Sequence, residues 1–163
     1  MSYSENVKIA PLLVSADINA GVDAESVNMG GGHSATFVLL FGSGLTGDAK
    51  MTVYTGATAG TKTTAITDWT GRVASAAIGS PNADVYASSE VTVDAGQTYA
   101  TLTGTTYAGK MLVVEIPARE VPADKPWVTL SFSADASAGS LAIVGLLTPR
   151  YKGEAIPTVL PTA

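Results

Sequence analysis

Apolar residues in this chain recur with the period of two that is typical of β-strands. The run 36–41, TFVLLF, has Phe, Leu and Phe at its odd positions and Val38 and Leu40 between them. Side chains alternate between the two faces of a strand, so this strand is apolar on both faces. Such a strand belongs in the middle of a sandwich or against a neighbouring molecule.

A second strand is predicted directly after it. Residues 50–54, KMTVY, place Met51 and Val53 on one face and the more polar side chains on the other. The connection 42–48, GSGLTGD, is rich in turn-forming residues but too long for a two-residue hairpin. The two runs therefore predict an antiparallel pair with a longer loop.

Further short strands follow at the intervals typical of sandwiches and barrels. We expect them near residues 7–14, 24–29, 62–66, 84–93, 99–102, 110–116, 127–133 and 141–148. Pro11 has no N–H for a ladder, so the first strand should lie at an edge or change partners there. We expect irregular connections at 68–83, 117–126 and 135–140, and a loop as long as the first usually has a function or contacts a partner.

No segment keeps a helical period long enough to predict a helix. The prediction is an all-β fold, an antiparallel β-sandwich that is jelly-roll-like, with extended terminal arms. One domain should span residues 1–150, with 1–6 as its N-terminal arm, and residues 151–163 should form an extended C-terminal arm. Pro157 and Pro161 favour a polyproline-like conformation in that arm.

The two arms hold the residues that we expect to bind a partner protein. Aliphatic side chains on a proline-stiffened arm would be exposed in a monomer, so we expect the C-terminal arm to dock on a neighbouring protein. The candidate partner-binding residues are Tyr3, Tyr151, Ile156, Val159 and Leu160.

The composition favours a protein that is buried against other proteins. Charged residues make up 14% of the chain, against about 25% in an average globular protein. A surface of Thr, Ser, Gly and Ala is easily desolvated, although a low-charge secreted module would have the same composition. The net charge is −5, and Lys and Arg are scattered singly, which argues against direct binding of nucleic acid.

The chain has no cysteine, which excludes disulfides, thiol nucleophiles and thiolate metal sites. The opening MSYSENVK has no apolar core of a signal peptide, and the apolar run 141–147 is too short to span a bilayer. We therefore expect a soluble product that is made in the cytoplasm and does not enter a membrane.

No set of residues predicts catalysis. His33 is the only histidine, and it lacks a recognisable nucleophile such as a serine in a G-x-S-x-G turn, so we interpret it as a turn or edge residue. The carboxylates are dispersed along the chain, although the sequence alone leaves open whether two of them meet in a cleft. They include Asp84, Glu90, Asp94, Glu115 and Glu120.

Metal, sugar and phosphate sites are also weakly supported. Residues 17–23, DINAGVD, resemble the start of a calcium loop, but the twelfth position, which needs a glutamate, holds Asn28. An Asx-turn loop is the simpler interpretation. Trp69 and Trp127 could stack on sugar rings, although packing in the core or an interface is favoured. No phosphate-binding glycine motif occurs. We expect no catalytic residues, no metal and no cofactor.

Three parts of the chain carry a resemblance to a known family. They are VKIAPLLVSADINAGVDAESVNM (7–29), VYTGATAGTKTTAIT (53–67) with IGSPNADVYASS (78–89), and the long closing part 107–151. In overall texture and order, the chain resembles the small structural proteins of tailed bacteriophage virions that decorate or cement heads. That resemblance implies a β-rich domain, no enzymatic activity and symmetric clusters, often trimers, on the outer shell. It transfers no functional residues.

The expected function is therefore that of a head decoration or cement protein on the capsid surface of a virion. Its expected partners are the major capsid protein and copies of itself, as a trimer. A phage tail or head–tail connector protein is one alternative. A carbohydrate-binding β-sandwich for host attachment is another, and it would present an aromatic shelf.

Overall fold

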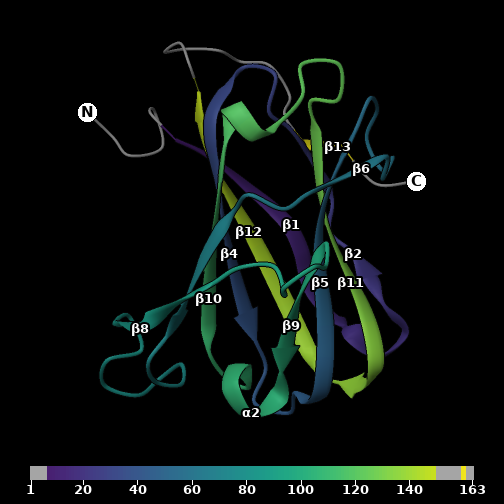
Figure 1. The fold of residues 1–163 in the computed structure, drawn as a ribbon. Coiled ribbons are helices and arrows are strands. Elements are labelled where there is room, and N and C mark those ends of the chain that lie inside the picture. The colour runs from purple at the N-terminus through teal and green to yellow at the C-terminus, as the bar shows by residue number, and fades with distance from the viewer. Residues whose placement is uncertain (1–6, 150–158, 161–163) are drawn as a thin grey trace.

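The protein folds into two antiparallel β-sheets that pack face to face (Figure 1). This computed structural model describes residues 7–149 and 159–160, without the side chains of residues 20, 134–138, 159 and 160. The predicted all-β fold and the β-sandwich are confirmed. The jelly-roll connectivity stays a prediction.

Sheet A has six strands. In spatial order they are β1 (Lys8–Asp17), β12 (Ser140–Pro149), β4 (Gly32–Phe41), β10 (Met111–Pro117), β7 (Thr70–Ala74) and β8 (Tyr86–Val91). The run 36–41, which is apolar on both faces, therefore lies in an interior strand, β4, as its pattern predicted.

Sheet B contains the other strands. Its main order is β13 (Val159–Leu160), β3 (Ser26–Asn28), β11 (Trp127–Ala138), β5 (Thr46–Gly56) and β6 (Thr64–Ile66). In addition, β2 (Val22–Asp23) pairs with β11, and β9 (Tyr99–Thr103) pairs with β5. The described helices are short: η1 (Ile18–Ala20), α2 (Gly104–Tyr107) and η2 (Ala118–Glu120).

The strand pairs are nested along the chain. The first strand pairs with the last long one, β1 with β12, and the pairs β3–β11, β4–β10 and β5–β9 follow inward. Each pair is antiparallel, and pairs alternate between the two sheets. These four pairs therefore join strands that are far apart in the chain.

The core lies between the sheets and is made of the inward-facing residues of both. On β4 these are Phe37, Leu39 and Phe41, which are at most 2% exposed, and Leu112 and Val114 of β10 lie beside them. Burial of each such side chain contributes roughly 1.5–3 kcal/mol. The hydrophobic effect across this layer therefore stabilises the sandwich.

The edge position predicted for the first strand is confirmed. β1 borders sheet A, and its pairing with β12 shifts register between Pro11 and Leu13 and again before Ala16. Missing ladder hydrogen bonds are tolerated at an edge, and bulges keep that edge from pairing with another chain.

Two predicted connections were wrong in part. β7 lies inside the expected irregular stretch 68–83, because Gly71 was interpreted as a break. A Cβ at Gly71 would lie 3.3 Å from the side chains of Leu112 and Val91, so glycine here allows close strand packing. β11 continues through 135–138, where we expected a turn, because β5 pairs with it that far.

The expected arms lie mostly outside the described residues. This holds for residues 1–6, which include Tyr3, and for Tyr151 and Ile156. Val159 and Leu160 form β13, whose backbone pairs with Val27 and Ser26 of β3 in the same chain. Binding of a partner protein by the five candidate residues stays a prediction.

Candidate functional site

The two sheets differ in the faces that point away from the core. On sheet B this face is polar: Lys50, Thr52 and Tyr54 of β5 stand beside Ser131 and Ser133 of β11. A polar outer face is usual for an antiparallel sheet with one side in water. Sheet A departs from this rule, so we treat its outer face as the candidate site.

One half of the outer face of sheet A, formed by β1, β12 and β4, is apolar. Val38 lies directly opposite Val144, and Val144 lies opposite Pro11. In the next row, Leu146 is opposite Ile9. We call this set the apolar stripe: Ile9, Pro11, Val38, Leu40, Ala142, Val144 and Leu146.

The side chains of the apolar stripe are more exposed to solvent than core residues are. Ile9 is 56% exposed and Leu40 is 38% exposed. Each outward residue occupies roughly 30 Å² of sheet, from the strand spacing and the two-residue repeat, so seven residues cover about 200 Å². Patches of this size also occur on ordinary monomers, so the stripe is a candidate interaction site because of its contrast with the polar outer face of sheet B.

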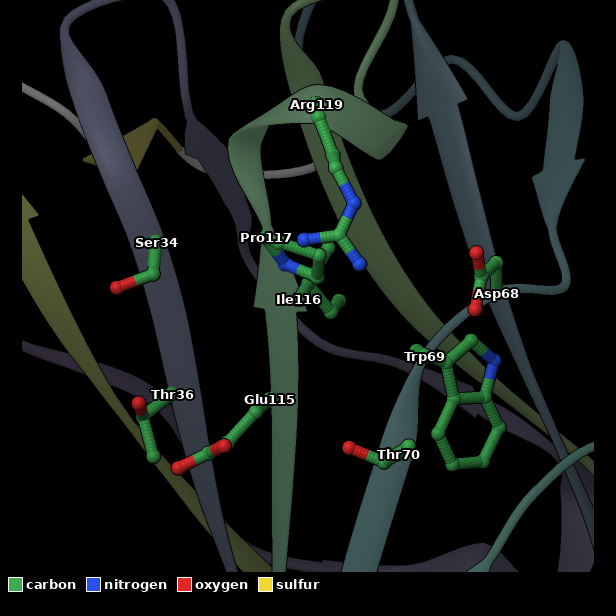
Figure 2. A pocket seen from close by; sticks show the side chains of 9 residues that line it. All are labelled: Ser34, Thr36, Asp68, Trp69, Thr70, Glu115, Ile116, Pro117 and Arg119. Carbon is green, nitrogen blue, oxygen red and sulfur yellow. The ribbon is translucent and has the colours of Figure 1, made fainter.

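The other half of the face carries a polar hollow of about 310 Å³ (Figure 2). We call it the polar hollow. Its lining residues are Ser34, Thr36, Asp68, Trp69, Thr70, Glu115, Ile116, Pro117 and Arg119. The strands β4, β10 and β7 form its floor, and the side chain of Arg119 extends from η2 toward that floor (Figure 2).

Strand register explains the chemistry of the floor. Glu115 of β10 lies opposite Thr36 of β4 on one side and Thr70 of β7 on the other. A carboxylate thus stands between two hydroxyl groups, with side chains roughly 5 Å apart. Above it, Arg119 Nε donates to Glu120 Oε1 at 3.0 Å. The hollow therefore combines hydrogen-bond donors with acceptors.

Trp69 forms part of the wall of the polar hollow. It is only 2% exposed, so it belongs to the core, and its ring face is not free to stack on a ligand. Its Nε1 atom is buried without a hydrogen-bond partner. Buried indole N–H groups usually donate to an acceptor, and the N–H of Trp69 lacks one.

A smaller groove of about 100 Å³ adjoins the polar hollow and shares Thr70 and Glu115 with it. Tyr86 of β8 borders this groove and is 43% exposed. Arg72 also lines it, and its guanidinium donates to Glu90 Oε1 at 2.8 Å. An aromatic side chain thus lies at the rim of the polar surface.

The residues of the possible calcium loop have other roles. Asp17 Oδ1 accepts the backbone N–H of Asn19 at 3.0 Å, which confirms the Asx-turn. Asp23 accepts from Lys62 Nζ at 2.8 Å and from the Ser131 hydroxyl at 2.6 Å. Within residues 7–149 and 159–160, no group of three potential ligands could hold a metal ion.

His33 is exposed at the start of β4, directly after the turn at residues 30–31, and β4 is an interior strand, so of the predicted turn or edge position the turn is the one that the structure supports. The sequence singled out Glu115 only as one of several dispersed carboxylates. It missed Asp68, Thr70 and Arg119, whose approach depends on the register of three strands.

Comparisons with protein families, curated proteins and solved structures gave no match. The outer face of sheet A is therefore the feature from which a function is inferred.

In the described part of the chain, no helix is long and apolar enough to cross a membrane.

Proposed function

We propose that the protein is a non-enzymatic structural protein of a tailed-phage virion, a head decoration or cement protein that binds the capsid shell through the apolar stripe. The observation that carries this proposal is the contrast between the two outer faces. Polar residues cover sheet B, whereas Val38, Leu40 and Val144 on sheet A are apolar and point outward.

The size of the apolar stripe supports a weak contact per copy. Burial of about 200 Å² at roughly 25 cal/mol per Å² contributes about 5 kcal/mol. The cost of association is similar or larger, roughly 4–15 kcal/mol. A single copy therefore needs further polar contacts at the rim, and many copies on a symmetric shell stabilise it through multivalency.

The nested strand pairs support a jelly-roll-like fold. A jelly roll is a rolled-up hairpin of two Greek keys, and the pairs β1–β12, β3–β11, β4–β10 and β5–β9 have that order. Jelly rolls recur in viral capsid proteins and in lectins. Because a fold does not determine a function, this agreement supports the proposal only in combination with the apolar stripe.

The chemistry of a cement protein requires no catalytic group. The partners that we propose are the major capsid protein and further copies of this chain, arranged as trimers. A tail or head–tail connector protein would also need an apolar docking surface. The copy number in the particle separates the two, because a decoration protein is present on every capsomer and a connector in a single ring.

Purified particles of the phage that encodes the chain provide the test. Quantitative mass spectrometry should detect the protein in stoichiometric proportion to the major capsid protein. Particles from a deletion mutant should assemble but lose their DNA at a lower temperature. Absence from the particle, or a copy number fitting one ring, would overturn the proposal.

A further inference from the structure

We propose that the polar hollow, together with Tyr86, binds a neutral pyranose sugar. This site is separate from the apolar stripe and goes beyond the proposed structural role. The proposal rests on the hydrogen-bonding groups of the hollow, its charge, the exposed aromatic side chain at its rim and the unmet hydrogen bond of Trp69.

The hydrogen-bonding groups match a ligand with several hydroxyl groups. Ionised Glu115 and Asp68 only accept hydrogen bonds, Arg119 only donates them, and Thr36 and Thr70 can do both. A ligand that serves all of them must donate and accept within a few ångströms. Adjacent hydroxyl groups on a sugar ring meet this requirement, whereas an ammonium group only donates hydrogen bonds and a fully ionised phosphate only accepts them.

The charge of the hollow disfavours an anionic ligand. Glu115 and Asp68 repel an anion such as a phosphate, a sulfate or an acidic sugar. The guanidinium of Arg119, which extends toward the floor in Figure 2, repels a cation. With two carboxylates and one guanidinium, the lining has no net positive charge that would attract an anion.

Tyr86 supplies the apolar surface that a pyranose ring needs. It is 43% exposed and borders the groove that shares Thr70 and Glu115 with the hollow. An aromatic ring offers a rigid apolar face at low entropic cost, on which the C–H face of a sugar can pack. A ligand that lies on Tyr86 can therefore reach Glu115 with its hydroxyl groups.

The buried Nε1 of Trp69 is an independent sign of an incomplete site. Its N–H has no acceptor in the described structure, although Trp69 lines the hollow. In Figure 2 this nitrogen lies on the edge of the ring next to Asp68, so a bound ligand would act on it by turning the Asp68 carboxylate toward the indole. Binding should then change the fluorescence of Trp69.

Most of the hollow lies on strands that the apolar stripe does not use. The stripe lies on β1, β12 and β4, whereas Glu115, Thr70 and Tyr86 lie on β10, β7 and β8 of the same sheet. A partner seated on β1, β12 and β4 leaves the other three strands, β10, β7 and β8, uncovered.

The test is a titration of the full chain with methyl glycosides of glucose, galactose, mannose and N-acetylglucosamine. Binding is followed by calorimetry and by tryptophan fluorescence in a Trp127→Phe background, which leaves Trp69 as the reporter. At least one glycoside should bind saturably with a Kd on the order of 1 mM. Glu115→Gln and Tyr86→Ala should each weaken it about tenfold or more.

Matched controls on sheet B separate the site from general effects. Asp48→Asn on β5 and Tyr99→Ala on β9 should bind as the wild type does. Glu115→Gln keeps the shape of the side chain, so a normal melting temperature for this variant excludes misfolding as the cause of lost binding.

Three results would overturn the proposal. The first is no saturable binding of any glycoside up to about 50 mM, well above the expected Kd. The second is binding that neither variant weakens, which places the ligand elsewhere. The third is a preference for methyl glucuronide over methyl glucoside, which contradicts a neutral ligand. None of these results bears on capsid binding by the apolar stripe, which is tested with separate variants.

Discussion

The hydroxyl groups of Ser26 and Thr129 hydrogen-bond at 2.6 Å, although the two residues lie 103 positions apart in the chain. Both are at most 1% exposed, and the backbone N–H of Gly60 donates to Ser26 Oγ at 2.8 Å. The connection between β5 and β6 thus closes over sheet B at this point. This explains why Thr129 is buried on the polar outer face of sheet B.

We expect Thr129→Val to lower the free energy of unfolding by about 1–3 kcal/mol, since it removes one partner of a buried hydrogen bond. Ser26→Ala should cost at least as much because it also leaves the Gly60 N–H without an acceptor. Urea unfolding of both variants and the double variant should give a coupling energy of about 0.5–3 kcal/mol. Strictly additive effects would contradict this network.

A second prediction concerns two glycines. A Cβ at Gly104 would lie 2.7 Å from the carbonyl oxygen of Leu45, and the backbone there has no room to move. Gly104→Ala should therefore destabilise the protein by about 1–3 kcal/mol, despite the better helix propensity of alanine.

Gly44→Ala is the matched control, because nothing lies within 4 Å of its added Cβ. It should be neutral or stabilise the fold by about 0.4–1 kcal/mol. Thermal and urea unfolding of both variants check the pair. Equal effects at the two positions would show that the close approach of α2 to the loop before β5 is wrong.

The pH dependence of stability should report on Tyr107. Burial, and secondarily the negative charge of Asp94, raise the pKa of its phenol above the usual 10.0. In the unfolded chain the phenol ionises at its ordinary pKa, so its contribution to stability is complete below about pH 10. It is then lost as the pH rises through the higher pKa of the folded state.

Tyr107→Phe should remove this part of the alkaline loss of stability. The variant keeps the edge-on contact with Phe41, whose ring centroid lies 5.9 Å away. The measurement is the difference in unfolding free energy between wild type and variant from pH 8 to pH 12, the range on either side of an ordinary tyrosine pKa. A difference that does not change with pH would contradict the raised pKa.

The period of two made much of the fold predictable. The alternation in 36–41 predicted both the buried row of Phe37 and Leu39 and the apolar outer row of Val38 and Leu40. Pro11 likewise predicted an edge strand. These features depend on local chemistry, so the sequence alone shows them.

The polar hollow was not predictable in the same way. Glu115, Thr36 and Thr70 are ordinary residues in three separate strands, and only the register of β4, β10 and β7 places them in a row. The strand β7 itself was missed because a glycine in a strand and a glycine in a loop look alike without knowledge of the neighbour. Both the hollow and β7 depend on pairing between strands that are distant in the chain, which the sequence alone does not show.

The central claim is that the apolar stripe docks the protein on a capsid shell. Its most direct test is co-sedimentation of purified protein with particles from the deletion mutant, comparing wild type, Leu40→Glu and Ser133→Glu. Both substitutions put a carboxylate on an outward strand position, but on opposite sheets. Leu40→Glu should lower binding about tenfold or more because the charge must be desolvated in the interface, and Ser133→Glu should bind as the wild type does. Normal binding by Leu40→Glu, or equal losses in both variants, would contradict the account.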